Sequence, residues 1–471
     1  MTDDAPAPNA APGRTLLRSN YLPALENVAQ SIGTVGPVAT IGTILPLLIY
    51  KSGNGTWLLF LGILGSFCLI STSINVFASR FASAGSLSAF AEIGLGRRAG
   101  SLTGWSYAVA MVFIVTSSAV SCAYYVALVV SHFTRTPVGT AALVATTVAV
   151  TLAAWWPSHR DIMLSTKIML GAEAVSLAII LVILCGAMFA SHRWIDAEQL
   201  TLKGVGFPQF RAAFVLAFMT LAGFESVTTL GEEAKAATHT LPRAMMLCLV
   251  PVCILFTGTI YCLTALSHSR SLALDQTDAP LDLVAQSLGL PTLGWMSSLG
   301  VAISCFGCML GGFNAGSRVI YSMARSGEVW RTFEEIHPVN GTPSRALGLL
   351  AAVSIVVPTA MILLGVSMSD AMDYLIQIAS FGFLGAYLLV CVAAPAFLSR
   401  HSGLGVGRIA IALAAMVVIG AAFFMSLVPV PDGPWRYLPY IYAGLLVAGM
   451  VVSGRLKASR GGRPAAARAS A

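Results

Sequence analysis

The chain has 471 residues, of which 56% are apolar and only 10% are charged, with a formal net charge of +7. Soluble domains carry roughly 25% charged residues, so this composition excludes an ordinary soluble protein and indicates many membrane-spanning helices with the lipid bilayer as partner. The positive charge is explained by Lys and Arg in loops on one side of a membrane, so no nucleic-acid partner is expected.

A membrane-spanning helix needs about 20 mainly apolar residues. By that criterion the sequence predicts an all-α polytopic protein with twelve spans: 24–50, 55–79, 103–131, 138–156, 163–190, 208–230, 243–267, 293–322, 345–365, 371–398, 407–428 and 435–454. An even number of spans places both termini on one side. If that side is the cytoplasm, 20 of the 27 Lys and Arg residues face inward and 7 outward, which predicts cytoplasmic termini in the cell (inner) membrane.

The first span carries helix-breaking residues a third of the way along. Gly33, Gly36 and Pro37 lie in an otherwise apolar segment, where proline removes a helical donor and glycine relaxes the backbone. We therefore expect this helix to unwind near Ser31 to Gly36.

The sixth span has an acid at its middle. Glu225 follows Ala222, Gly223 and Phe224, after which an apolar helix resumes. A carboxylate at the bilayer centre costs roughly 2.5 to 3.5 kcal/mol, so it is expected to face a cavity or a partner helix. Two interrupted spans in corresponding positions of two halves point to the binding site of a secondary transporter.

The remaining segments predict no cofactor, metal site or catalytic group. Residues 1–22 are expected to form a disordered cytoplasmic arm and 456–471 a basic cytoplasmic tail. The nine cysteines lie in apolar segments and the seven histidines in predicted loops, without a metal-ligand pattern. A short amphipathic helix is expected near 280–288, and a surface or re-entrant helix within 81–100.

Four stretches resemble the amino acid–polyamine–organocation (APC) superfamily of permeases. They are SIGTVGP (31–37), SAGSLSAFAEIGLGRRAGSLTGW (83–105), GFESVTTLGEEAKAATHTLPRAM (223–245) and SRVIYSMARSGEVWRTFEEIHPVNGTP (317–343). The resemblance implies leucine-transporter-like inverted repeats of five helices, at 23–190 and 191–400, with two peripheral helices in 401–455. It also implies alternating access around a site between the first and sixth helices.

An amino acid presents a carboxylate and an ammonium to such a site. Backbone N–H groups at a half-helix start carry partial positive charge, and unwound carbonyls accept from an ammonium. We therefore expect a carboxylate cradle at Ser31, Gly33, Thr34, Val35 and Gly36. The ammonium is expected at carbonyls near Ile32 and from Met219 to Ala222, and Gly223 is also expected to bind substrate. Phe224 is expected to be either a lid over the substrate or ordinary packing against the tenth span.

The coupling residues follow from the buried acids and from the resemblance. Glu225 is expected to gate or sense protons, as similar permeases imply, or to make a structural hydrogen bond. Glu173 could relay protons or hold a polar neighbour, and the second role is preferred. Ser176 stands where some proton-coupled relatives have a lysine, so that device is absent here, and Ser176 and Ser304 are candidates for a cation site. Proton symport or exchange is nevertheless favoured over coupling to sodium.

The sequence favours a transporter over two other classes. A membrane enzyme would need catalytic groups facing a cavity, and a transporter-like amino-acid sensor would carry an output domain. Polyamine or amine cargo is the alternative within transporters, but it calls for several acids. Because only Glu225 is well placed near the breaks, a neutral amino acid is predicted.

Overall fold

The computed structural model describes residues 17–192, 194–270, 272, 279–401, 406–428 and 433–461. Within these ranges the chain is helical, apart from turns and one isolated bridge between Leu22 and Ala234. Helices dominate because hydrocarbon offers no hydrogen-bond partner, so each spanning segment must satisfy its own backbone.

The long helices, in chain order, are α4 (Thr56–Ala78), α6 (Arg97–Thr134), α7 (Thr140–Arg160), α8 (Ile162–Ser191), α11 (Ala237–Arg270), α13 (Pro291–Arg325), α14 (Ser344–Leu363), α15 (Met368–His401), α16 (Val406–Leu427) and α17 (Leu438–Gly461). The shorter α-helices are α1 (Ala24–Val35), α2 (Pro37–Thr43), α3 (Leu45–Ser52), α5 (Leu87–Leu95), α9 (Ala197–Leu200), α10 (Phe207–Met219) and α12 (Pro280–Ser287). Four 3-10 turns complete the list: η1 (Gly53–Gly55), η2 (Phe224–Leu230), η3 (Arg331–Glu334) and η4 (Gly433–Tyr437).

Ten of the described helical segments are long and apolar enough to cross a membrane. They correspond to ten of the twelve predicted spans. The first and sixth spans are absent from this set because each is interrupted: α1, α2 and α3 form the first, and α10 and η2 form the sixth. The all-α membrane fold predicted from hydropathy is confirmed, and so is the placement of both interruptions in these two spans.

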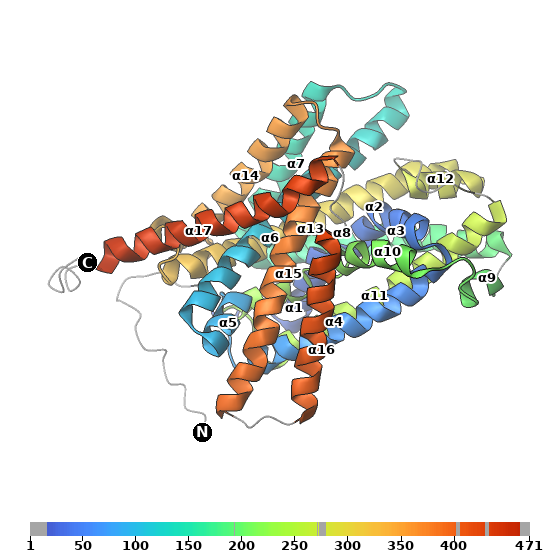
Figure 1. Cartoon of the computed structure of the whole chain (residues 1–471). Helices are drawn as coiled ribbons and strands as arrows, with labels where there is room; N and C mark the ends of the chain where they lie inside the picture. Colours follow the sequence, from blue (N-terminus) through green and yellow to red (C-terminus); the bar gives the residue numbers. More distant parts are fainter. Residues whose placement is uncertain are drawn as a thin grey trace.

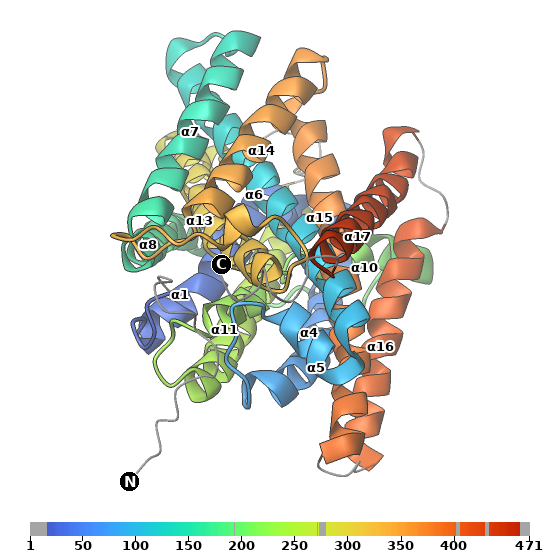
Figure 2. The ribbon, with the colours of Figure 1, turned by 90° about the vertical axis from the view of Figure 1, so that its left-hand side faces the viewer.

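Three long helices form the centre of the bundle. α6 packs against α13 and α15 along most of its length, and α1 lies among α8, α11, α13 and η2. Viewed from the side, α7 lies at one edge and α16 at the other (Figure 2). The two interrupted spans are thus held inside a frame of continuous helices.

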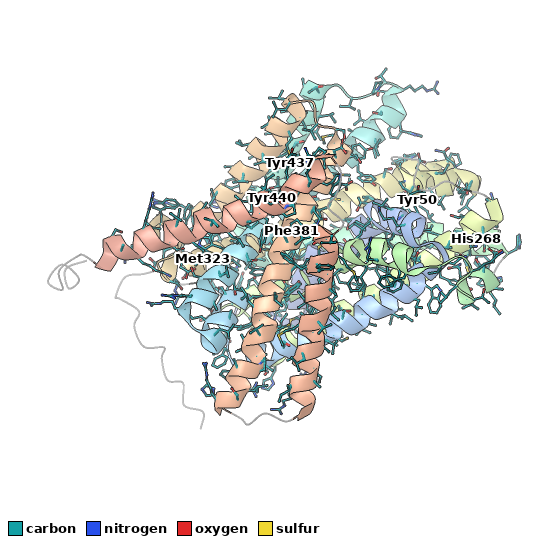
Figure 3. The ribbon with its side chains drawn as sticks, viewed as in Figure 1. Tyr50, His268, Met323, Phe381, Tyr437 and Tyr440 are labelled. Atoms are coloured by element: carbon teal, nitrogen blue, oxygen red, sulfur yellow. The ribbon has the colours of Figure 1, made fainter. Side chains whose placement is uncertain are left out.

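The molecule has two distinct ends (Figure 1). α9 and α12 lie at the right-hand end, together with Tyr50 and His268, whereas α5 and Met323 lie at the left (Figure 3). α12 is the short helix expected near 280–288, and α5 is the one expected within 81–100.

Two flanking segments differ from expectation. Residues 17–22, assigned to a disordered arm, are packed: Leu17 is buried, and the backbone N–H groups of Tyr21 and Leu22 donate to the carbonyl of Glu233 at 2.8 and 2.9 Å. α17 continues to Gly461, so the first residues of the predicted tail are helical. The rest of both segments, 1–16 and 462–471, lies outside the described residues.

Candidate functional site

The break in the first span is confined to one residue. α1 stays helical through Val35, and Gly36 alone takes a left-handed conformation, with φ 57° and ψ 70°. The expected unwinding of residues 31–36 was therefore wrong in extent, because the N–H groups of 31–35 belong to the helical ladder of α1 and that of Gly36 donates to Ile32 O at 2.9 Å. A side chain at Gly36 would also collide with Cys308, whose Sγ lies 2.0 Å from the position of a Cβ.

A buried carboxylate occupies the start of α2. The N–H of Val38 donates to Glu173 Oε1 at 2.9 Å, and the N–H of Ala39 donates to Ser304 Oγ at 2.9 Å. Ser304 Oγ in turn donates to Glu173 Oε2 at 2.7 Å. Glu173 is 4% exposed. In this conformation Glu173 and Ser304 satisfy the N–H pair that the helix restart leaves without a helical partner.

The break in the sixth span follows the same plan. The chain turns through 220–223, and Gly223 has φ 94° before η2 begins. The N–H of Gly223 donates to Tyr387 Oη at 3.2 Å, and Tyr387 Oη donates to the carboxylate of Glu225. Glu225 is fully buried. A carboxylate of the chain itself therefore stands at the start of each resumed half-helix.

Direct hydrogen bonds hold the two breaks together. Ser31 Oγ donates to Phe224 O at 2.7 Å, and Ser226 Oγ donates to Thr34 Oγ1 at 2.9 Å. Gln30 Nε2 extends the contact to Gly311 O on α13 at 2.8 Å. The breaks face each other, as a shared site requires.

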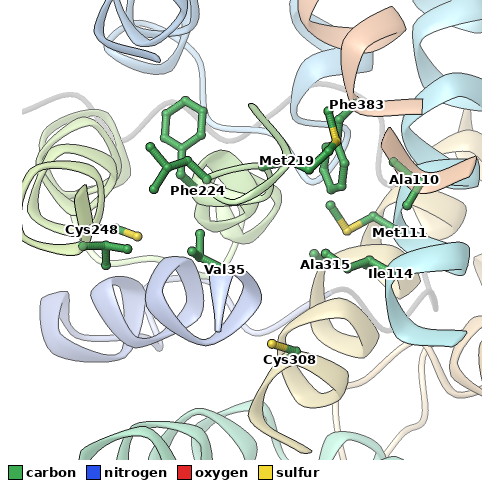
Figure 4. Close-up of a cluster of buried hydrophobic side chains, with 14 of the residues drawn as sticks. Val35, Ala110, Met111, Ile114, Met219, Phe224, Cys248, Cys308, Ala315 and Phe383 are labelled. Carbon is green, nitrogen blue, oxygen red and sulfur yellow. The ribbon is translucent and has the colours of Figure 1, made fainter. Parts of the chain in front are cut away.

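A cavity of about 520 Å³ begins at this junction. Thr34 and Val35 from α1, and Met219 and Ala222 from the sixth span, line its deep part. Figure 4 shows Val35, Met219, Ile114 and Cys308 converging here from different segments. The cavity reaches Ser369, which is solvent-exposed, so it opens toward the end of the molecule that carries α12.

The described cavity lining is rich in hydroxyl groups and holds a single charged side chain. The hydroxyls come from Thr, Ser and Tyr residues at positions 34, 40, 43, 117, 118, 121, 124, 125 and 369. Asp373 on α15 supplies the carboxylate, and no Lys, Arg or His is among the lining residues that the structure describes. Hydropathy did not single out Asp373, because it stands only two residues inside the predicted tenth span. Ser369, Asp373 and Ile376 share one face of a helix by their spacing. That spacing was the signal by which Asp373 could have been recognised as a lining residue.

The other sequence-predicted residues fall behind the cavity wall. Ser31, Ile32, Gly33, Gly36, Gly223 and Phe224 adjoin the breaks without lining the cavity. The ring of Phe224 packs edge-on against Phe67, with centroids 5.4 Å apart, and at a tilt against Tyr387 of the tenth span, with centroids 6.1 Å apart. Ser176 Oγ donates to Ala172 O of its own helix at 2.8 Å, so the structure pairs Ser304 with Glu173 rather than with Ser176.

The opposite end of the junction is closed by charged and backbone contacts. The guanidinium of Arg318 donates to both carboxylate oxygens of Glu233, and both side chains are 1% exposed. Arg18 pairs with Asp161 at 3.1 Å, and the N–H of Lys235 donates to Leu22 O at 2.9 Å. Hydropathy cannot pair residues so far apart in sequence, so this closure was not predicted.

Comparison with known proteins identifies a family and several similar transporters. A family model described as "Amino acid permease" matches residues 28–452. An uncharacterized transporter of Mycobacterium tuberculosis is 26% identical over 337 residues, which is 70% of this chain and 71% of that protein. The branched-chain amino acid permease BcaP of Bacillus subtilis is 24% identical over 276 residues, or 58% of this chain and 56% of that protein. Cationic amino acid transporter 5 of Arabidopsis thaliana is 27% identical over 186 residues, or 39% and 30%.

Proposed function

The chain belongs to the amino acid permease family, and on that premise we propose that it carries amino acids across a membrane by alternating access. One observation carries the proposal: a cavity of about 520 Å³ starts where two interrupted helices meet, opens toward one end and is shut off from the other. A secondary transporter needs this arrangement in one of its states, and the chemistry requires no catalytic step.

The orientation follows from the charge bias of the loops. We place the chain in the cell (inner) membrane, with both termini in the cytoplasm. The cavity then opens outward, and Arg318, Glu233 and residues 17–22 close the cytoplasmic side. Transport requires these closing contacts to separate while the α12 end closes over the cargo. The inverted repeats at 23–190 and 191–400 supply the two elements that move against each other.

Two buried carboxyl groups support coupling to protons. Glu173 holds the start of α2, and Glu225 with Tyr387 holds the start of η2. The charged form of a carboxyl is costly to bury, so a buried carboxyl can accept a proton. A protonated carboxyl is a weaker hydrogen-bond acceptor, so protonation of Glu173 or Glu225 would weaken its bonds to the half-helix and allow the half-helix to move. Proton symport or exchange is therefore our proposal, and Ser304 acts in it as the partner of Glu173.

Uptake by the purified full chain in liposomes tests these proposals. We expect saturable uptake of a labelled amino acid, driven by an imposed inward proton gradient and unaffected by a sodium gradient. Binding without uptake under every gradient would favour the sensor alternative. Uptake of amines without uptake of amino acids would favour the polyamine alternative.

The charge of the cargo side chain depends on which acidic residues line the cavity. Two of the relatives are named for branched-chain and for cationic amino acids. The sequence-based prediction of a neutral cargo rested on Glu225 as the one acid near the breaks. In the structure Glu225 is behind the wall, and Asp373 lines the cavity instead.

A further inference from the structure

We infer that Asp373 selects cargo with a distal cationic group, so that the cavity takes basic amino acids or related amines in preference to neutral ones. The inference rests on the proposed transport function and deepens it. The charges and helix dipoles at the junction of the two breaks support it.

Two helix ends that line the cavity at the junction of the breaks are negative ends, whereas α3, α12 and α15 begin at other parts of the lining, where Pro46, Pro280 and Ser369 contribute. Thr34 and Val35 are the last residues of α1, and Met219 is the last residue of α10. The carbonyls at a helix C-terminus carry a partial negative charge, equivalent to roughly half an elementary charge per helix. The deep part of the cavity therefore favours a cation.

The positive helix ends at the two breaks are already neutralised by the chain. Glu173 and Ser304 accept from the first N–H groups of α2, and the carboxyl of Glu225, held by Tyr387, stands at the start of η2. A carboxylate from the cargo gains little at either place in this state. No basic side chain of the described lining compensates for the negative ends.

Asp373 places the one acidic side chain of the described lining along the same path. It lies on the face of α15 that also carries Ser369, Met372 and Ile376 to the cavity, between the exposed mouth and the buried floor. Two charged groups act on it electrostatically: Lys51, which follows the cavity-lining part of α3, and Asp370. Asp370 is exposed and does not line the cavity, and it accepts a hydrogen bond from Ser367.

A carboxylate in a partly dehydrated cavity discriminates by charge. It makes a charge-assisted hydrogen bond to an ammonium or guanidinium. When the cargo has an apolar side chain of equal length, the desolvated carboxylate is left without a compensating partner. Lysine, norleucine and cadaverine separate the contributions, because they share a carbon chain. Norleucine lacks the distal ammonium, and cadaverine lacks the carboxylate.

The test is initial-rate uptake of these three compounds by the full chain in liposomes. We expect the unaltered chain to prefer lysine to norleucine at least tenfold in kcat/KM. In Asp373→Asn the KM for lysine should rise at least about 30-fold, which is the lower end of the range for removing one partner of a buried, hydrogen-bonded charge pair, and the KM for norleucine should change less than about threefold. Asp373→Glu should restore most of the preference, and the matched control Asp370→Asn should leave it intact.

Several outcomes would overturn the inference. Equal losses for lysine and norleucine in Asp373→Asn would make Asp373 a gate or a structural residue, for example a partner of Lys51, instead of a selectivity residue. Preference for norleucine in the unaltered chain would contradict it directly while leaving amino acid transport standing. If the chain takes up none of the three compounds and no other amino acid, the transport proposal itself is contradicted. If Asp373→Asn does not fold, the salt dependence of the unaltered chain decides: KM for lysine should rise with ionic strength and that for norleucine should not.

Discussion

At the scale of single residues, the site is organised by carboxylates that touch backbone. Glu173 comes from α8 but closes the start of α2, about 135 residues away in sequence, through Val38 and Ser304. Buried acids are tolerated only where such donors are present, because an unpartnered charge in a dry interior is strongly destabilising. Hydropathy could predict that Glu173 and Glu225 need partners. It could not identify them, because the partners lie on other helices.

Ser304 and Ser176 give a direct comparison of two buried serines near Glu173. Ser304→Ala removes the acceptor of the Ala39 N–H and a donor to Glu173, so we expect it to lower the free energy of unfolding by about 1 to 3 kcal/mol. Ser176→Ala removes only a hydrogen bond to its own helix and should cost less than about 0.5 kcal/mol. Thermal unfolding of the two variants in detergent, with matched lipid content, measures the difference. Equal melting temperatures would show that Ser304 does not support the start of α2.

Asp196 offers a pH-dependent comparison outside the membrane-spanning segments. Burial acts to raise the pKa of this carboxyl, but hydrogen bonds from Gln199 and His268 and the adjacent histidine charge outweigh burial, and the pKa is lowered. A lowered pKa stabilises the folded state above the unfolded-state pKa of about 3.9, and this stabilisation is lost as the pH falls through the lowered folded-state pKa. Asp196→Asn should therefore reduce the melting temperature at pH 6 to 7, with the gap to the unaltered chain narrowing below about pH 4. A gap independent of pH would indicate a purely steric effect.

At the scale of elements, the interruptions define the architecture. The sequence predicted which two spans break, because glycine and proline inside a long apolar run have few other uses. It overestimated the length of the first break. Gly33 lies within α1 and packs under Met169, whose Sδ lies 2.0 Å from the position that a Cβ would take. Its small size therefore permits close packing, whereas at Gly36 glycine permits the left-handed backbone conformation.

Gly36→Ala tests the first break. The substitution places a Cβ on a residue with φ 57°, which costs roughly 1 kcal/mol or more, and drives it against Cys308. We expect uptake to fall at least tenfold and the melting temperature to drop. The double variant Gly36→Ala with Cys308→Ala should recover part of both. Gly365→Ala is the control, since Gly365 has φ 83° with open space around it. If Gly365→Ala is as damaging as Gly36→Ala, the contact with Cys308 is irrelevant.

At the scale of the whole molecule, one end of the bundle is open and the other is shut. The shut end depends on contacts between distant segments, including residues 17–22 with 233–235 and Arg318 with Glu233. Composition and hydropathy gave the number of spans and the charge bias of the loops. The state of the transporter follows from such pairings, which no local pattern in a single sequence displays.

Neighbouring glutamates separate a buried pair from an exposed one. Glu233 pairs with Arg318 at 1% exposure on both sides, whereas Glu232 pairs with Arg325 at 29% and 43%. Glu233→Gln leaves the Arg318 charge uncompensated and should cost about 3 to 5 kcal/mol of stability, or shift the chain toward a state open at this end. Glu232→Gln should cost no more than about 1 kcal/mol. Unfolding in detergent, together with proteolysis of the 17–22 segment, reads out both effects; similar behaviour of the two variants would contradict a closing role for Glu233.

The central claim is that cargo binds in the cavity between the two interrupted helices, and thiol labelling tests it most directly. In a chain whose native cysteines are replaced, a cysteine at Thr43, which lines the cavity, should react with a membrane-impermeant maleimide added from outside. Cargo should slow that reaction with a half-maximal concentration equal to its transport KM, while a cysteine at exposed Ser367 should react at the same rate with or without cargo. Reaction at Thr43→Cys that is unaffected by saturating cargo, in a chain that still transports, would place the cargo elsewhere and contradict the account.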